Sequence, residues 1–304
     1  MKKNKKILVL LGGRSRERAI SFQSGNACYS AIKKIGYDVS KYDPIKNISS
    51  NIKKLKPDLV FNCLHGKYGE DGKIQKILEN LKIPYTHSGV KSSENAMNKI
   101  KSKKIFIQNK IKTPDYKIIR KISDINNKIS HSKFIIKPIN EGSSLGVKII
   151  NKLTKPNIKQ IKKLIKIYKV LIQEIYIEGK EIQTAVLGDK TIGSVEIIPK
   201  RKFYDFRAKY LSSAKTIHLI PPKISLNLDS KIKKIALKAH KSLGCKGVTR
   251  SDFRVMNNGK IYILETNTQP GMTKLSLVPE IACKYGLNFN KLVDWMIKDA
   301  SIKR

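Results

Sequence analysis

Cysteine is scarce in this sequence of 304 residues, which has four cysteines and no Cys-x-x-Cys pair. A disulfide framework and a zinc ribbon both need paired cysteines, so the sequence excludes them and fits a reducing compartment. Apolar runs are short as well, and none approaches the length that spans a bilayer. We therefore expect a cytoplasmic protein with no membrane partner.

Arginine is also scarce, with nine residues against 54 lysines, although the formal net charge is +40. A charge of this size is typical of proteins that bind nucleic acid or anionic membranes. However, arginine is the usual reader of guanine edges and phosphates, and the lysines are spread along the whole chain. A compositional bias towards Lys, Ile and Asn at surface positions explains the charge better, so we expect no nucleic-acid partner.

Two common nucleotide-binding motifs are missing. The sequence contains neither the Walker A pattern of P-loop NTPases nor the Gly-x-Gly-x-x-Gly pattern of dinucleotide-binding enzymes. Both classes depend on those glycines to bring backbone N–H groups close to phosphates. The sequence therefore gives little support to either class.

The first ninety residues alternate strand-like and helix-like segments. An apolar strand at residues 7–11 ends in Gly12-Gly13, and arginines follow where a signal peptide would need small residues. Later segments suit a helix at 17–35, strands at 37–42 and 58–61, and a helix at 73–81. This order predicts an α/β domain with a doubly wound parallel sheet over residues 1–90. Ligands gather at the carboxyl ends of such strands, where the glycine-rich turns at 12–13 and 65–72 lie.

The rest of the chain suits two α+β units, a central one at 91–176 and a C-terminal one at 177–304. The expected strands are those at 134–138, 146–150, 170–176, 181–187, 191–198, 247–256 and 260–267. The expected helices are those at 95–109, 155–169, 229–243 and 290–303. We therefore predict a fold of α/β and α+β domains, three in all.

The segment from Arg250 to Asn267 carries the clearest chemistry. Asn258-Gly259 between two alternating apolar runs predicts a two-residue hairpin loop. That loop would place Asp252 opposite Glu265 and Arg250 opposite Asn267, with all four side chains on one face. Facing carboxylates repel each other and need compensation. A hard cation such as Mg²⁺ would provide it through these oxygens, but Arg250 and Arg254 could also neutralise the pair without metal.

The central unit contains a candidate phosphate-binding loop. Lys137 ends an apolar strand, and the turn at residues 141–144 (EGSS) offers backbone N–H groups and hydroxyls. In the N-terminal unit Glu17 begins a helix, where an acid also favours the helix dipole. His65 lies in a loop so rich in glycine that a core position is unsuitable for it. Each of these signals is weak when taken alone.

Taken together, these segments resemble the D-alanine–D-alanine ligases, a family of the ATP-grasp superfamily. The resemblance runs nearly from end to end and rests on seven segments in the same order. They are residues 12–18 (GGRSRER), 65–72 (HGKYGEDG), 97–99 (MNK), 137–144 (KPINEGSS), 204–210 (YDFRAKY), the hairpin with Asp252, and 265–277 (ETNTQPGMTKLSL). The resemblance implies a three-domain ATP-grasp architecture, with ATP held between the central and C-terminal sheets.

The resemblance also implies an activity, in which ATP phosphorylates the carboxylate of one D-alanine and the amine of a second displaces phosphate. This reaction supplies a peptidoglycan precursor. The implied cofactors are ATP and two Mg²⁺ or Mn²⁺ ions, held by Asp252, Glu265 and Asn267. Such relatives are commonly homodimers.

The family's pattern gives the remaining matched residues the following roles. Glu17, hydrogen-bonded to Ser143 and Tyr210, would hold the first ammonium group, and His65 would line the same pocket. Arg250 and the backbone N–H of Gly271 would bind the oxyanion, while Ser276 and Leu277 would receive the second carboxylate. The implied ATP-binding residues are Lys99, Lys137, Ser144, Glu174, Tyr176, Glu181 and Lys209.

The sequence departs from the family at Arg207, where many relatives carry an acid, and at Arg14, where Thr is frequent. Both departures affect loop closure and affinity more than the reaction. Tyr210, in place of Phe, matches ligases that form a dipeptide rather than a D-lactate ester. Two alternatives remain open: an ATP-grasp carboxylate–amine ligase with another substrate, and a basic nucleic-acid-binding protein with a degenerate ligase fold.

Overall fold

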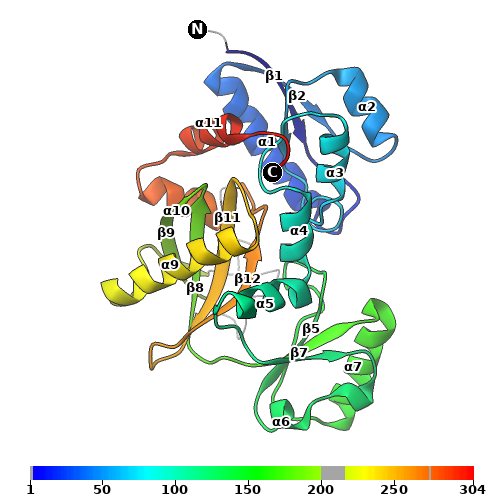
Figure 1. Cartoon of the computed structure of the whole chain (residues 1–304), viewed down its shortest axis with the longest axis vertical. Helices are drawn as coiled ribbons and strands as arrows, with labels where there is room; N and C mark the ends of the chain where they lie inside the picture. The colour runs from blue at the N-terminus through cyan, green and yellow to red at the C-terminus, as the bar shows by residue number, and fades with distance from the viewer. Residues whose placement is uncertain (1–2, 200–215, 274) are drawn as a thin grey trace.

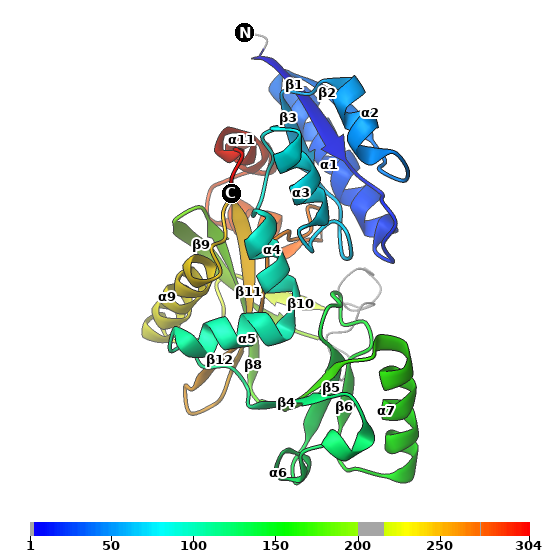
Figure 2. The same ribbon diagram turned by 45° about the vertical axis from the view of Figure 1, so that its right-hand side comes forward.

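The computed structural model describes residues 3–199, 216–273 and 275–304. Three sheets organise this part of the chain, and Figures 1 and 2 show them following one another along the long axis of the molecule. Within the described ranges, no helix combines the length and apolar character needed to cross a bilayer. The fold is mixed α/β, as the sequence predicts.

The N-terminal sheet is parallel, with strand order β2-β1-β3. Its strands are β1 (Lys3–Leu10), β2 (Tyr37–Tyr42) and β3 (Leu59–Asn62). The helices α1 (Arg18–Ile35), α2 (Ile48–Leu55) and α3 (Lys73–Asn80) surround it. α1 packs on one face, whereas α2 and α3 contribute to a separate cluster on the other. Helices on both faces are typical of a doubly wound sheet, so this expectation is confirmed.

The central sheet is antiparallel, with strand order β4-β7-β5-β6. Its strands are β4 (Tyr116–Ile119), β5 (Phe134–Pro138), β6 (Lys148–Ile150) and β7 (Leu171–Ile175). The neighbouring helices are η1 (Ile122–Asp124), α6 (Asn127–Ser130) and α7 (Lys155–Tyr168). The apolar side of α7 packs on this sheet (Figure 1), which leaves the opposite face towards the rest of the molecule.

The C-terminal sheet is antiparallel and has five strands in the order β10-β9-β8-β11-β12. The strands are β8 (Lys180–Leu187), β9 (Lys190–Ile198), β10 (Ile217–Leu219), β11 (Val248–Val255) and β12 (Ile261–Asn267). The helices that pack near it include α9 (Leu226–Ser242), α10 (Leu277–Lys284) and α11 (Phe289–Asp299). One cluster joins α10 and α11 to α1 and the N-terminal sheet, so the N-terminal and C-terminal parts share a core (Figure 2).

The single helix predicted over residues 95–109 is wrong, because two helices occupy this region. They are α4 (Val90–Met97) and α5 (Lys99–Gln108). Asn98 between them has an extended backbone, and its side chain accepts hydrogen bonds from the N–H groups of Ile100 and Lys101. Asparagine favours this N-cap position, so a new helix starts here. The break places Lys99 on the first turn of α5, beside the Ile139 carbonyl.

The two-residue hairpin loop predicted at Asn258-Gly259 is also wrong. The N–H of Met256 donates to the Lys260 carbonyl, so three residues form the loop, and Gly259 has a φ of 77°. One extra residue would move every later side chain of β12 to the other face. A bulge at Leu264 removes this offset, because Phe253 pairs with Ile263 but Asp252 pairs with Glu265. The pairs Asp252–Glu265 and Arg250–Asn267 therefore form as predicted.

Candidate active site

A cleft lies where the three sheets approach one another. Its first half is lined by predicted site residues for the substrates, the oxyanion and the metal, namely Glu17, His65, Ser143, Arg250, Glu265, Asn267, Gly271, Ser276 and Leu277. Its second half is lined by Lys99, Lys137, Ser144, Glu174, Tyr176, Glu181, Asp252 and Glu265. Lys99 and Glu265 line both halves, so the two form one continuous site.

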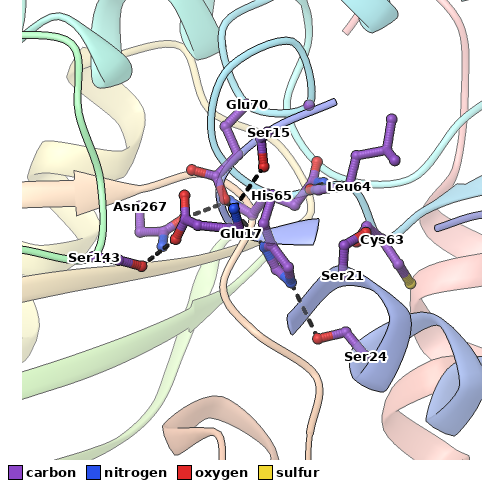
Figure 3. A network of polar contacts seen from close by, with 12 residues as sticks. Ser15, Glu17, Ser21, Ser24, Cys63, Leu64, His65, Glu70, Ser143 and Asn267 are labelled. Carbon is purple, nitrogen blue, oxygen red and sulfur yellow. Dashed lines mark hydrogen bonds and ion pairs between the residues drawn. The ribbon is translucent and has the colours of Figure 1, made fainter. Parts of the chain in front are cut away.

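Glu17 brings the N-terminal and central parts of the chain together. It is the N-cap residue of α1, it is 6% exposed, and its Oε1 accepts a hydrogen bond from the Ser143 hydroxyl (Figure 3). Gly66 lies against the same carboxylate, because a Cβ at Gly66 would lie 2.4 Å from Glu17 Oε2. Ser143 and Ser144 both have positive φ, so the backbone of their loop is strained where it lines the cleft. The result is an enclosed carboxylate suited to an ammonium group.

His65 belongs to a chain of hydrogen bonds that leads away from the cleft (Figure 3). Its Nδ1 lies 3.1 Å from Glu70 Oε1, and its Nε2 lies 3.1 Å from the Ser24 hydroxyl on α1. A carboxylate can only accept, so this order places the ring proton on Nδ1 and lets Nε2 accept from Ser24. His65 is thereby fixed in orientation at the wall of the first half of the cleft.

Arg250 and Asp252 form an ion pair along one face of β11. The Arg250 Nε and Nη2 atoms donate to the two Asp252 carboxylate oxygens at 2.8 and 3.0 Å. On the neighbouring strand, Glu265 pairs with Lys99 at 3.3 Å, and Lys99 also donates to the Glu141 carbonyl at 2.7 Å. Arg254 pairs with Glu181 rather than with either hairpin carboxylate. Among the described residues, Asp252 thus has Arg250 as a cationic partner, and Glu265 has Lys99.

The donor set at this hairpin fits a hard divalent cation. Asp252 and Glu265 present carboxylates from adjacent strands, and Asn267 adds an amide whose oxygen already accepts from the Gln269 N–H. In the part of the chain that the structure describes, no three His, Cys, Asp or Glu side chains converge as a ligand set. Two carboxylates and one amide leave positions for water and phosphate oxygens, as Mg²⁺ prefers.

The loop after β12 leads directly to α10 and contains Gly271. A Cβ at Gly271 would lie 2.7 Å from Ser276 Oγ, so this position requires glycine for close approach. The Ser276 hydroxyl accepts from the Thr273 N–H at 2.9 Å, and Leu277 begins α10. Hydroxyl and N–H groups at a helix start can bind a carboxylate. Gly271, Ser276 and Leu277 line the same half of the cleft as Glu17.

A buried charge cluster forms the floor of the second half of the cleft. Glu174 on β7 pairs with Lys137 at 2.8 Å and with Lys103 at 3.1 Å. Burial alone would raise the pKa of Glu174, but the two lysines outweigh it and hold that pKa below its ordinary value. Burial lowers the pKa of Lys103 to about 8, with Glu174 opposing the shift. Lys103 also donates to Thr113 Oγ1 at 2.6 Å, which fixes its position.

Tyr176 lines this half of the cleft. The Lys133 ammonium lies 3.9 Å from the centre of the Tyr176 ring, and the Arg254 guanidinium lies 5.6 Å from it. Arg254 also binds Glu181 at 3.1 Å, which orients the guanidinium. An aromatic ring stacked with cations offers a flat surface to a planar base.

Two predicted residues, Lys209 and Tyr210, lie outside the described residues, as does the departure at Arg207. Sequence reasoning missed four buried residues behind the cleft: Ser24, Asn62, Lys103 and Gln269. Lys103 lies four residues after Lys99, and this helical spacing was the one signal that could have indicated it. The others are brought together by tertiary contacts over long sequence separations.

Comparison with known proteins adds to this geometry. Residues 104–298 match a family model described as the D-ala D-ala ligase C-terminus, and residues 38–88 match one for the N-terminus. The chain is 54% identical to a D-alanine–D-alanine ligase of Pelagibacter ubique, with 99% of both chains covered. It is 45% identical to D-alanine–D-alanine ligase B of Mesorhizobium japonicum, covering 99% of this chain and all of the relative.

Solved structures are similar as well. The D-alanine–D-alanine ligase from Bacillus anthracis complexed with ATP superposes with a TM-score of 0.83 at 30% identity, and 97% of each chain is covered. The VanG D-Ala:D-Ser ligase from Enterococcus faecalis gives a TM-score of 0.83 at 26% identity, covering 97% of this chain and 99% of the other.

Proposed function

Because the chain belongs to the D-alanine–D-alanine ligase family, we propose that its cleft joins two D-alanines through an acyl phosphate formed with ATP. The protein is an ATP-dependent ligase of cell-wall precursor synthesis. The observation that supports the location of the reaction is the contact between Glu17 and Ser143, which closes one site from two separate parts of the chain. In this proposal the predicted domains at 1–90, 91–176 and 177–304 each contribute residues to the cleft.

In the first step, the first D-alanine binds through its ammonium group to Glu17. Ser143 donates to Oε1 of that carboxylate and keeps it in place, and His65 lines the same half of the cleft. Tyr210, outside the described residues, would complete the contact with Glu17 by family resemblance. Holding the substrate carboxylate near the γ-phosphate makes phosphoryl transfer between them effectively unimolecular, which lowers the entropic part of the barrier.

The nucleotide would occupy the second half of the cleft. Tyr176, Glu174 and Glu181 would hold the base and ribose, and Lys99, Lys137, Ser144 and Lys209 would balance the phosphates. Mg²⁺ or Mn²⁺ bound by Asp252, Glu265 and Asn267 would neutralise phosphate charge and align the phosphoryl group. Lys99 would link phosphate binding to the cation site, because it contacts both Glu265 and the Glu141 carbonyl of the loop over the cleft.

In the second step, the amine of the second D-alanine attacks the acyl carbon and phosphate leaves. Ser276 and the N–H of Leu277 would bind its carboxylate at the start of α10. Charge develops on the acyl oxygen during the attack, and Arg250 and the Gly271 N–H would stabilise it. The two hydrogen bonds from Arg250 to Asp252 fix the orientation of the guanidinium, which supports this role.

Two further expectations accompany this function. An ATP-using reaction and four free cysteines are consistent with a cytoplasmic protein. Relatives of this kind are commonly homodimers, which sedimentation of the purified chain would test.

The direct test measures ADP release and dipeptide formation with ATP, Mg²⁺ and D-alanine. D-serine, D-lactate and L-alanine serve as alternative substrates, since one structural neighbour is a D-Ala:D-Ser ligase. We expect D-alanyl-D-alanine as the main product. No ADP release with D-alanine would exclude this function and leave another carboxylate–amine ligase. Salt-sensitive binding to duplex DNA would support the alternative of a nucleic-acid-binding protein.

A further inference from the structure

The loop from Gln269 to Met272, here called the 269–272 loop, is fastened to the N-terminal part of the chain at both of its ends. At the first end, Asn62 Nδ2 donates to Gln269 Oε1 at 2.7 Å, and Gln269 Nε2 donates to the Leu64 carbonyl. Asn62 is the last residue of β3, and Leu64 directly precedes His65. The loop that carries Gly271 is therefore bound to the loop that carries His65.

The buried amide pair formed by Asn62 and Gln269 makes several hydrogen bonds, and Asn62 uses both donors of its amide. Asn62 Nδ2 also reaches the Gly69 carbonyl at 3.3 Å, and Asn62 Oδ1 accepts from the Leu64 N–H at 3.1 Å. Asn62 is fully buried and Gln269 is 1% exposed. Buried polar groups that satisfy one another fix a unique geometry, because any shift leaves a donor or acceptor without a partner.

At the other end of the loop, the Met272 N–H donates to the Ser24 hydroxyl at 3.2 Å. The same hydroxyl contacts His65, which in turn contacts Glu70 (Figure 3). Gly271 thus lies between two points that α1 and the β3 end hold in place. Neither Asn62, Gln269 nor Ser24 is among the residues that line the cleft.

We propose that Asn62 and Gln269 are positioning residues for the peptide-forming step, because they fix the 269–272 loop relative to the first-substrate site. This inference rests on the proposed function, in which Glu17 holds the first D-alanine and the Gly271 N–H serves the oxyanion. Glu17 lies after β1 of the N-terminal sheet and Gly271 lies after β12 of the C-terminal sheet, so the separation between them depends on the hydrogen bonds that join these two parts. A displacement of about 1 Å can cost about 100-fold in rate.

The phosphoryl-transfer step should depend less on this fastening. Lys99 and Lys137, two of the residues assigned to the phosphates, lie on α5 and β5 and make no described hydrogen bond to the 269–272 loop. The loop reaches the candidate cation site through the Gln269 backbone N–H, which donates to Asn267 Oδ1 and which a side-chain substitution at Asn62 or Gln269 does not delete. Loosening the loop should therefore slow the attack of the amine more than the formation of the acyl phosphate. A general loss of structure would slow both steps, whereas loss of positioning should slow the attack of the amine more.

The experiment compares Asn62→Ala, Asn62→Asp, Gln269→Ala and the double alanine variant with the unchanged chain. The first step is measured with D-alanine and ATP labelled with ¹⁸O at the β–γ bridge, by following the return of label to non-bridging positions. The second step is measured as dipeptide formed. We expect dipeptide kcat to fall about 10- to 100-fold, the KM for ATP to stay within about twofold, and label exchange per dipeptide to rise at least about tenfold.

Gln75→Ala is the matched control. Gln75 is also buried, and it donates to the same Gly69 carbonyl at 2.8 Å, but it makes no described hydrogen bond to the 269–272 loop. It should leave the ratio of exchange to dipeptide unchanged. The double alanine variant should lose less than the sum of the two single losses, because both single variants already delete the hydrogen bond between Asn62 and Gln269.

Three outcomes would overturn the proposal: exchange and dipeptide formation falling together, no change in either, or the same ratio change in Gln75→Ala. If Asn62→Ala does not fold, Gln269→Ala decides, since it deletes the same hydrogen bond from the other side and leaves Asn62 in place. An unchanged chain that shows no D-alanine-dependent ADP release would refute the proposed function instead, so the two failures are distinguishable.

Discussion

Asp252 and Glu265 face each other across the β11–β12 hairpin, and a bulge at Leu264 creates this alignment. Without the bulge, the three-residue loop at the hairpin tip would set Asp252 opposite Leu264. The carboxylate of Glu265 would then point to the opposite face of the sheet, because side chains alternate along a strand. The candidate cation site therefore depends on one irregularity in β12.

Replacing Glu265 with alanine should remove nearly all turnover. The change deletes one of two facing carboxylates and the partner of Lys99, so both metal and phosphate would lose support. We expect dipeptide formation to fall by about 10³-fold or more, as for loss of a strong electrostatic contact in a closed site. Glu178→Ala, at an exposed acid, is the control. Wild-type activity in Glu265→Ala would show that the metal assignment is wrong.

Gly66→Ala should weaken binding of the first D-alanine. A Cβ at this position would lie 2.4 Å from Glu17 Oε2, so the carboxylate must move. We expect the KM for D-alanine to rise at least about tenfold, since 1.4 kcal/mol corresponds to a factor of ten, with the KM for ATP little changed.

Gly244→Ala is the control for this prediction. Gly244 has nearly the same positive φ as Gly66, 70° against 67°, but a Cβ there would meet nothing within 4 Å. It should show only the backbone cost of about 1 kcal/mol in unfolding free energy. An equal rise in KM for both variants would contradict the role assigned to Glu17.

Lys103→Met should destabilise the protein and weaken ATP binding. Removing this lysine leaves the buried Glu174 carboxylate with Lys137 as its remaining ion-pair partner. Breaking a buried pair costs about 3–5 kcal/mol, whereas removing both charges can be nearly neutral. Urea unfolding should therefore show a large loss in Lys103→Met and partial recovery in Lys103→Met with Glu174→Gln. Equal stability of the single variant and the unchanged chain would contradict this account.

Two buried histidines should make the fold sensitive to acid. Burial lowers the pKa of His87 to about 3, and burial lowers the pKa of His240 to about 4. The unfolded chain takes up these protons near pH 6.5 but the folded chain does not, so stability is present above that pH and is lost as the pH falls. Between pH 7 and 5 each histidine should remove about 2 kcal/mol of unfolding free energy.

His87→Asn tests this dependence, because asparagine tolerates the positive φ of 70° at this position and does not titrate. The slope of unfolding free energy against pH should become shallower in this variant. His131→Asn, at an exposed histidine, is the control. An unchanged slope in His87→Asn would show that His87 is not the group that titrates.

Local patterns predicted much of the fold. The parallel N-terminal sheet followed from alternation. The facing pairs at Asp252 and Arg250 were predicted from a two-residue loop, and they form because the bulge at Leu264 offsets the longer loop. The break at Asn98 was missed because the helical periodicity of the sequence continues across it. The signal for a new helix is a single asparagine, whose side chain caps α5. The loop length was missed because Asn258-Gly259 fits two kinds of turn, and the compensating bulge has no composition signal.

The candidate site shows the same limit. Residues in motifs were found, and the structure brings those that it describes into one cleft. Asn62 and Gln269 are 207 positions apart, and no periodic pattern around either residue predicts their contact. Buried amide pairs arise from tertiary packing, which one sequence cannot reveal.

The central claim is that D-alanine is activated through its carboxylate in the cleft that Glu17 and Glu265 line. The most direct measurement uses D-alanine labelled with ¹⁸O in its carboxylate, together with ATP and Mg²⁺, and analyses the released phosphate by mass spectrometry. An acyl phosphate intermediate predicts one ¹⁸O atom in each phosphate released with a dipeptide. Unlabelled phosphate accompanying dipeptide formation would contradict the account.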